Sequence, residues 1–351
     1  MKLNQKRAPA AMLATIIAAL TILIVSAGCA GGNKKGDSNG KPGMIQPSGK
    51  MSVLVLGSGG PVAAKTGRAS SGFLIFIDGK PRILMDAGGG TFKSLAQAGI
   101  NIKDLDIVLL THLHLDHMGD LSPIIKTMFF HNRGAKTMRK APIHIYGPSA
   151  NGIPFPGTQI PQYPSTSEFA KGKYSKESGV ARYLHIFARA IKGGTFSYEA
   201  HDVPAGKKLP VREIYKKDGL TIKAVGVVHG PVPALAYRIE YGGKSVVYSG
   251  DTSSKTGNMA KISRGADLLF YDTAIMDNIP PKAKNKVFYV LHTTPSRMGQ
   301  VAKTANPAKL VLAHITPVTE PRLDKVKSLV RAQGYKGAID VASDLKLYNL
   351  E

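Results

Sequence analysis

Short apolar runs, most of them ended by glycine or by a polar turn, recur along the chain from Met51 onward and predict β-strands. Two of the turns, Asp78-Gly79 and Gly242-Gly243, lie between adjacent runs and are typical of β-hairpins. The expected strands fall within residues 51–60, 72–90, 105–110, 141–148, 220–230, 235–251, 266–274, 309–314 and 345–350.

Three further segments, 120–130, 295–306 and 320–334, have the apolar spacing of helices. The last of them has Pro321 near its start and Gly334 at its end, which are the usual boundary signals of a helix. Hairpins come first in each half of the pattern, and helices follow them. We therefore expect an α/β protein in which two mixed sheets pack face to face with helices outside.

The segment 147–218 departs from this pattern. It is rich in proline, glycine, lysine and tyrosine, and its apolar positions have weak periodicity. We expect an inserted subdomain or a lid here, within one domain that spans residues 51–351.

The N-terminus is expected to be a targeting segment. Basic residues within 1–7 precede an uncharged apolar stretch and the letters SAGC, as in a secretory signal peptide. Cys29 follows two small residues, which resembles a bacterial lipobox, although Ser26 replaces the usual aliphatic residue. We expect a lipoprotein signal peptide at 1–28, lipidation and membrane attachment at Cys29, and a flexible tether at 29–50.

An uncleaved anchor helix is the alternative for this segment, because residues 8–33 carry no charge and are long enough to span a bilayer. Both interpretations export the remainder of the chain. Neither says whether the anchor lies in an inner or an outer membrane.

The composition is that of a globular protein, since hydrophobic residues make up 43% and charged residues 20% of the 351 positions. Cys29 is the only cysteine, which excludes disulfides and cysteine metal sites from residues 51–351. The formal net charge is +24, and it is still +21 without residues 1–28, which hold three basic residues and no acidic one. This balance favours anionic small-molecule partners, although it also agrees with a role in solubility alone.

The segment LLTHLHLDHMGD, residues 109–120, holds three of the ten histidines within six positions. Along an extended segment, residues two apart point the same way, so His112 and His114 should converge. Asp116 and His117 stand where a helix is expected to begin, and they should face a second point. Nitrogen and oxygen ligands at this density suit zinc or a related divalent ion. We expect two ions, because four such side chains hardly reach one tetrahedral centre.

Completing ligands stand at the ends of three other apolar runs: His229 ends AVGVVH, Asp251 ends SVVYSGD, and His314 ends LVLAH. Any one of them alone would be a weak signal. Their equivalent positions on three expected strands indicate that they share one rim with the histidine segment.

At these residues the sequence resembles the metallo-β-lactamase superfamily, over nearly the whole of 51–351. The resemblance rests on Asp86 in LMDAG, the HLHLDH segment, His229, Asp251 in SGDT, and His314. It implies an αββα sandwich of two mixed sheets flanked by helices. It further implies that one ion takes His112, His114 and His229, that the other takes Asp116, His117 and His314, that Asp251 bridges both, and that Asp86 orients a ligand.

Zinc is the expected metal, with manganese or iron as alternatives. Because zinc lowers the pKa of a bound water toward ~7, the two ions would supply hydroxide at neutral pH. The residual positive charge of such a site favours an anionic substrate. Asp116 is the candidate for orienting or deprotonating the nucleophile.

Three stretches, VLGSGGP, SSGFLI and HGPVPALAYRIEYGGKSVVYSGDT, are similar to the ribonuclease Z, phosphodiesterase and arylsulfatase branch. In that branch a histidine about twenty residues before the last ligand acts near the leaving-group oxygen, which makes His292 a candidate general acid. A packed loop histidine is the alternative. Asp251 stands where one major class of β-lactamases has cysteine, so antibiotic hydrolysis is not expected.

Two departures argue against the processing of transfer RNA. Ribonuclease Z has a glutamate-containing HEAT stretch where this chain has YDTAI, with Asp272 in the acidic place. After His314 the chain continues ITPVTEP instead of the Ser-Arg-Tyr continuation usual in that family. An exported protein would also not meet precursor tRNA, so tRNA is not an expected partner.

Basic and aromatic side chains are interleaved in residues 171–192. Together they suit a nucleotide or an aryl group, and a solvated lid surface is the alternative. The candidate substrate-binding residues are Lys171, Lys173, Tyr174, Arg182 and Tyr183.

The expected function is therefore that of an exported, dinuclear metal-dependent hydrolase acting on phosphodiesters or aryl sulfates. One alternative is a carboxylic ester, lactone or thioester hydrolase on the same site. Another is a non-catalytic surface lipoprotein that binds metal or anions, against which the presence of every expected ligand argues. The sequence leaves the oligomeric state open, a homodimer included.

Overall fold

The computed structural model describes residues 45–175, 177, 181–278 and 286–351. The predicted signal peptide, Cys29 and most of the predicted tether lie outside the described residues. In the ranges that are described, no helix has the length and apolar character needed to cross a membrane.

The first sheet has the strand order β14-β1-β2-β3-β4-β5-β6. Its pairs from β14 to β3 are antiparallel, and its pairs from β3 to β6 are parallel. The strands are β1 (Met51–Gly57), β2 (Gly72–Ile77), β3 (Lys80–Ala87), β4 (Ile107–Leu109), β5 (Ile143–Pro148), β6 (Tyr198–Val203) and β14 (Leu347–Leu350).

The second sheet has the order β13-β12-β11-β10-β9-β8-β7 and repeats the arrangement. Its pairs from β7 to β10 are antiparallel, and its pairs from β10 to β13 are parallel. The strands are β7 (Arg212–Lys217), β8 (Leu220–His229), β9 (Val232–Tyr241), β10 (Lys244–Tyr248), β11 (Leu268–Asp272), β12 (Lys309–Ala313) and β13 (Ala338–Val341).

Alternating side chains give each sheet two buried faces. In β1, Val53 and Val55 lie in the core between the sheets, whereas Leu54 and Leu56 lie in the layer beneath the helices. Across the inner core, the ring of Phe73 in the first sheet is 4.9 Å, between centroids, from the ring of Phe270 in the second. The central strands therefore appear in the sequence as continuous apolar runs, because neither of their faces meets water.

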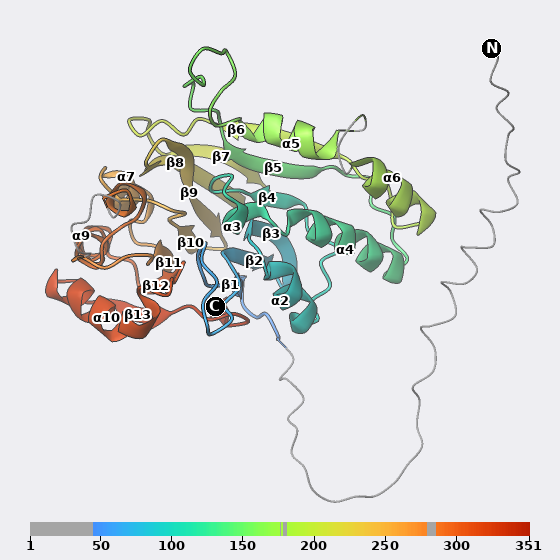
Figure 1. Cartoon of the computed structure of the whole chain (residues 1–351). Coiled ribbons are helices and arrows are strands. Elements are labelled where there is room, and N and C mark those ends of the chain that lie inside the picture. Colours follow the sequence, from blue (N-terminus) through green and yellow to red (C-terminus); the bar gives the residue numbers. More distant parts are fainter. Residues whose placement is uncertain (1–44, 176, 178–180, 279–285) are drawn as a thin grey trace, which may run out of the picture. The chain divides into compact units, whose positions relative to one another are not determined.

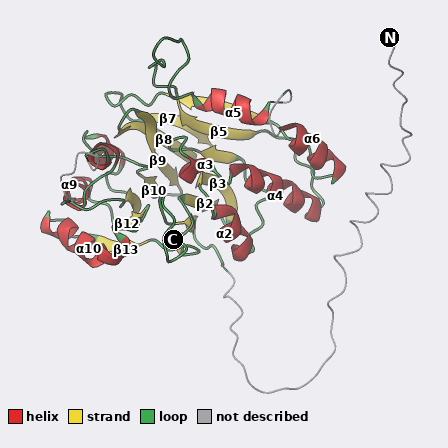
Figure 2. Ribbon diagram, viewed as in Figure 1, coloured by secondary structure: helices red, strands yellow, loops and turns green. Residues whose placement is uncertain are grey.

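Helices cover the outer face of each sheet (Figure 1, Figure 2). The first sheet is covered by α2 (Thr91–Ala98), α4 (Leu121–Gly134), α5 (Thr166–Tyr174) and α6 (Ala181–Ala190), and the second by α7 (Asn258–Ile262), α9 (Pro295–Ala305) and α10 (Leu323–Ala332). Two short helices, α3 (Leu115–Met118) and α8 (Phe288–Leu291), and the 3₁₀ turn η2 (Glu320–Arg322) complete the elements named here. The predicted sandwich of two mixed sheets flanked by helices is confirmed.

Residues 147–218 are more closely integrated than an insert or lid would be. They supply the edge strands β6 and β7 of both sheets, and buried side chains of α5 and α6 belong to the core over the first sheet. The segment that stands out is the loop 149–164 between β5 and α5, drawn in green in Figure 1. Edge strands are partly exposed and weakly apolar, so their sequence pattern resembles that of a loop.

Candidate metal centre

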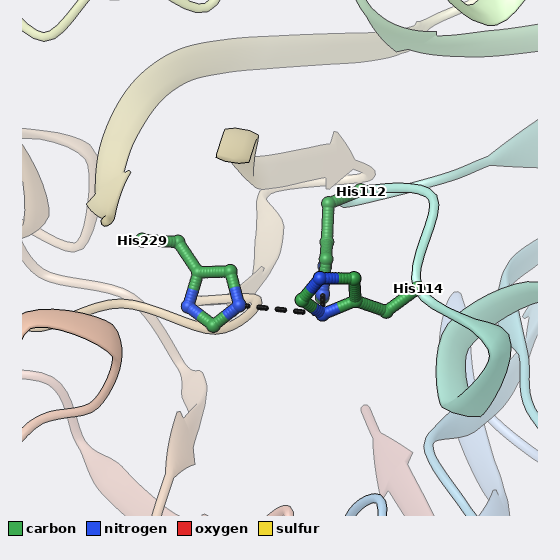
Figure 3. Close-up of side chains that lie close together, drawn as sticks. All are labelled: His112, His114 and His229. Carbon is green, nitrogen blue, oxygen red and sulfur yellow. Dashed lines mark hydrogen bonds between the residues drawn. The ribbon is translucent and has the colours of Figure 1, made fainter. Parts of the chain in front are cut away.

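One cluster of imidazoles forms where the chain leaves β4 and β8. His112 and His114 lie on the extended segment after β4, and His229 is the last residue of β8. His112 Nε2 is 2.9 Å from His114 Nδ1, which in turn is 3.4 Å from His229 Nε2. Figure 3 shows the three rings turned toward one point. We call these residues the histidine cluster.

A second cluster, here the carboxylate cluster, consists of Asp116, His117, Asp251 and His314. Asp116 Oδ2 is 3.3 Å from both His117 Nε2 and His314 Nε2. Asp116 and His117 come from α3, Asp251 follows β10, and His314 follows β12. The four ligand-type side chains of the HLHLDH segment thus divide between the two clusters.

The carboxylate of Asp251 lies between the two clusters. Its Oδ2 is 3.9 Å from His112 Nε2 and 3.8 Å from His229 Nε2. Its Oδ1 is 3.4 Å from His117 Nε2 and 3.2 Å from His314 Nε2. Each oxygen thus faces a different cluster, which is the arrangement expected of a carboxylate shared by two cations.

Asp86 orients His117 from behind. Its Oδ2 is 2.7 Å from His117 Nδ1, and the backbone N–H and hydroxyl of Thr111 both donate to the same carboxylate at 2.8 Å. A protonated Nδ1 leaves Nε2 with its lone pair toward the cluster. Leu291 does the same for His229, whose Nδ1 lies 2.8 Å from the Leu291 carbonyl oxygen.

Asp272 has the corresponding place in the second sheet, and sequence reasoning noted it only as a departure from ribonuclease Z. Its Oδ2 is 2.9 Å from His292 Nδ1, and its Oδ1 is 3.4 Å from His314 Nδ1. It is fully buried and ends β11, the strand between those that precede Asp251 and His314. That shared position at a strand end was the signal that would have identified it.

The chain passes very close to the ligands at two glycines. A Cβ on Gly60 would lie 2.8 Å from the His314 ring, and one on Gly88 would lie 2.0 Å from the Asp116 carbonyl oxygen. Asp86 and His314 themselves have φ of 55° and 52°, in the left-handed region. Such backbone is costly for non-glycine residues, and it is typical of functional sites.

The buried atoms of the two clusters are suited to metal ions. Within the described part of the chain, His117 Nε2 and Asp251 Oδ1 are buried side-chain atoms without a hydrogen-bond partner. A buried polar atom without a partner is costly, and a cation would satisfy both. In the histidine cluster, burial lowers the pKa of His229 to about 4 and the pKa of His112 well below its ordinary value. These imidazoles are thus neutral, as ligands must be.

The carboxylate cluster favours positive charge instead. Burial opposes protonation of His314, but Asp251, Asp116 and Asp272 outweigh it and raise its pKa to about 10. Burial raises the pKa of Asp116, but His117 and His314 outweigh this effect and hold the pKa well below its usual range. A divalent ion that displaces the proton of His314 would supply positive charge in its place.

The candidate substrate-binding residues have different surroundings. Tyr174 is a correction, because its ring is buried in the core over the first sheet, with its hydroxyl 3.2 Å from Ser122 Oγ. Its side chain is 1% exposed, so it offers a ligand almost no surface. Tyr183 is 78% exposed on α6, where it lines a groove of about 560 Å³ with Lys126 and Phe187.

Lys173 lies near the metal-binding segment: its Nζ is 4.0 Å from the sulfur of Met118 in α3. Lys171 lines a separate hollow of about 490 Å³ beside Tyr198. Arg182 donates to the Glu177 carbonyl oxygen at 3.3 Å. Substrate binding by these three basic residues stays a prediction.

Residues 66–278 match the model of the metallo-beta-lactamase superfamily. A ribonuclease Z of Mycobacterium bovis is 28% identical over 298 residues, which cover 84% of this chain and 96% of the relative.

Solved structures share the fold at lower identity. Human tRNase Z, short form, has a TM-score of 0.60 at 20% identity, over 86% of this chain and 99% of that structure. The metallo-beta-lactamase fold protein YhfI from Bacillus subtilis has a TM-score of 0.58 at 21% identity, over 85% and 99%. The chain belongs to the metallo-beta-lactamase superfamily, and it is a metal-dependent hydrolase.

Proposed function

We propose that this chain is an exported, lipid-anchored hydrolase that uses two divalent metal ions, zinc foremost, to cleave phosphodiesters or aryl sulfates. The observation that carries the dinuclear part is Asp251, whose two oxygens face two separate groups of ligand atoms. A pair of divalent ions at these groups would supply Lewis acidity and activate water as the nucleophile.

The chain's own side chains have distinct roles in this proposal. Asp116 Oδ2 lies at the edge of the carboxylate cluster, in position to accept a proton from the attacking water. The His292 ring lies 5.5 Å, between centroids, from the His314 ring, and Asp272 holds its Nδ1, so its Nε2 is left to protonate the leaving-group oxygen. Burial opposes charge on His292, but Asp272 and Asp251 outweigh it and raise its pKa, which favours the acid form.

Exposed apolar side chains near the metal centre favour a substrate that carries an organic group next to its anionic group. Leu115, between the two halves of the metal-binding segment, is 74% exposed, and Phe288 and Val290 of α8 are 43% and 38% exposed immediately before His292. Exposed apolar side chains this close to a polar centre are typical of binding sites. With the positive charge of the chain, they favour a substrate that joins a phosphate or sulfate to an aryl group.

Ribonuclease activity is the alternative that the relatives' names raise, and the loss of the HEAT glutamate in favour of Asp272 argues against it. A carboxylic ester, lactone or thioester hydrolase would use the same ligands. A non-catalytic metal-binding lipoprotein would not need His292 held by a buried carboxylate.

The test uses the full chain loaded with zinc or manganese, with its metal content measured. We expect turnover of bis-p-nitrophenyl phosphate or of p-nitrophenyl sulfate, lost on chelation and in His314→Ala. Precursor tRNA and a lactone panel are assayed in parallel. No turnover of either nitrophenyl substrate by the metal-loaded protein would contradict the proposal, and cleavage of only tRNA or only lactones would assign the site to that class.

Export and lipidation are tested separately by mass spectrometry of the purified N-terminus. We expect a lipid-modified Cys29 as the first residue. An intact Met1 would contradict the lipoprotein proposal while leaving the hydrolase proposal untouched.

A further inference from the structure

A group of metal-ligand side chains that shares no residue with the metal centre lies at the edge of the first sheet, on β5 and β6. It consists of His144, Glu199 and His201, whose ligand atoms all lie within 4.8 Å of one another. His144 Nδ1 is 3.2 Å from His201 Nε2 and 3.3 Å from Glu199 Oε2. These contacts bring one nitrogen of each ring and one carboxylate oxygen close together.

The register of the two parallel strands produces this convergence. His144 pairs with Glu199, and Tyr146 pairs with His201. Ile143 and Ile145 point into the layer beneath the helices, so His144 and Tyr146 share the opposite face of the sheet. The His201 ring stacks on Tyr146, with centroids 4.3 Å apart and an interplanar angle of 14°. The orientation of one imidazole is thereby fixed before any ligand binds.

The geometry is that of ligands around one ion. With Zn–N bonds of about 2.0–2.1 Å, two nitrogens on a tetrahedral ion are roughly 3.3 Å apart. The observed separation of the two ring nitrogens is 3.2 Å. The side chain of His144 is 31% exposed and that of Glu199 is 56% exposed, so the point between them is open to solvent. A remaining coordination position would thus be free for water or for an outside ligand.

We propose that His144, Glu199 and His201 bind a divalent transition-metal ion of the zinc, copper or nickel group, separately from the two clusters of the metal centre. Two imidazoles and one carboxylate suit this group of ions and suit calcium or magnesium poorly. The residues of the metal centre lie at or after the ends of β4, β8, β10 and β12, whereas this set lies within the last two strands of the first sheet. The formal charge of +24 makes non-specific cation binding by the rest of the chain less favourable.

The bound ion would link edge strand β6 to its only neighbour in the described sheet, β5. Because it binds the folded strand pair and not the unfolded chain, it stabilises the edge by mass action. The site is therefore expected to act on stability and not on the hydrolytic reaction.

The experiment counts bound ions in the full chain. After equilibrium dialysis against zinc alone, elemental analysis should find one ion more per chain in the natural protein than in Glu199→Gln or in His201→Gln. The matched control is Glu213→Gln, which makes the same change at an exposed glutamate on β7, the edge strand of the other sheet. It should retain the full number of ions, and hydrolysis should be unchanged in all three variants.

Copper gives a second readout. With Cu²⁺ as the probe, the natural chain should show an electron paramagnetic resonance signal with two-nitrogen coordination that His201→Gln loses. Equal ion counts and equal copper spectra in the natural chain, Glu199→Gln and His201→Gln would overturn the proposal. So would an equal loss in Glu213→Gln, because the ion would then be bound by exposed carboxylates in general.

Discussion

The two sheets contribute to the metal centre in different ways. The first sheet supplies His112, His114, Asp116 and His117 from one continuous segment after β4. The second supplies its ligands singly, from the ends of three different strands, as His229, Asp251 and His314. A ligand set concentrated in one segment is fixed by local turn geometry, whereas a dispersed set depends on the packing of a whole sheet.

Behind these ligands the two sheets are alike. Each has one buried aspartate beside a histidine of its own sheet: Asp86 is hydrogen-bonded to His117, and Asp272 Oδ1 lies 3.4 Å from His314 Nδ1. The difference is that Asp272 also holds His292. In the second sheet, one aspartate therefore contacts both a candidate metal ligand and the candidate acid. Changes in the second sheet should therefore affect both metal binding and the chemical step.

The largest effect is expected for Asp251→Asn, which keeps the volume of the shared side chain and removes its charge. Turnover should fall at least about a thousandfold, or about 4 kcal/mol of transition-state stabilisation, because both of the proposed ions would lose a common ligand. Metal content and kcat/KM for the nitrophenyl substrate measure this. Asp324→Asn, at a side chain that is 98% exposed, is the matched control. Full activity in Asp251→Asn would disprove the shared role.

His292→Gln should come next, with turnover reduced by about 10²–10⁴ while the metal content is unchanged. The loss should be larger for substrates with an alkyl leaving group than for those releasing p-nitrophenolate, because p-nitrophenolate departs without a proton. A leaving-group series separates this role from packing. An equal loss for every leaving group would indicate that His292 only supports the site.

A smaller effect is expected from the paired variants Asp86→Asn and Asp272→Asn. Each should weaken the binding of the ion at the carboxylate cluster by about 10- to 100-fold, since the supported imidazole loses its orientation. Zinc titration of the two proteins gives the comparison directly. Only Asp272→Asn should also alter the leaving-group dependence, and the same change in Asp86→Asn would show that the two sheets do not differ as described.

The smallest effect is expected for Tyr174→Phe, at a residue of the first sheet's helical layer. Its loss of the hydrogen bond to Ser122 should lower the free energy of unfolding by about 1 kcal/mol and leave KM unchanged. Thermal unfolding and steady-state kinetics test both parts. A severalfold rise in KM without loss of stability would instead show that Tyr174 contributes to substrate binding.

The side chains that form the two clusters could be singled out from sequence because polar side chains at the ends of buried strands are rare and easily recognised. His229, Asp251 and His314 each follow an apolar run, and the spacing of the HLHLDH segment divides it between two points. Asp272 has the same signal but was not recognised as part of the site, because no local motif surrounds it. Its role depends on β11 lying beside β12, which only the folded sheet makes visible.

The region 147–218 was harder to interpret for a different reason. The β6 strand has one buried residue in six, and β7 has none that is fully buried, so neither strand shows the apolar run of a central strand. Tyr174 likewise lies among basic residues in sequence, although the helix turns it toward the core. Burial on one side of an element at the margin of a sheet is set by tertiary packing, which composition does not reveal.

Each of the two clusters draws side chains from both sheets, and this has a consequence for folding. The ligand set of either cluster is complete only after the sheets have docked, so a bound ion favours the docked state alone. At a free metal concentration a thousandfold above Kd, one such ion adds about 4 kcal/mol to the free energy of unfolding. The ions would then stabilise the packing of the two sheets against each other. Metal scarcity would reduce the lifetime of the folded protein as well as its activity.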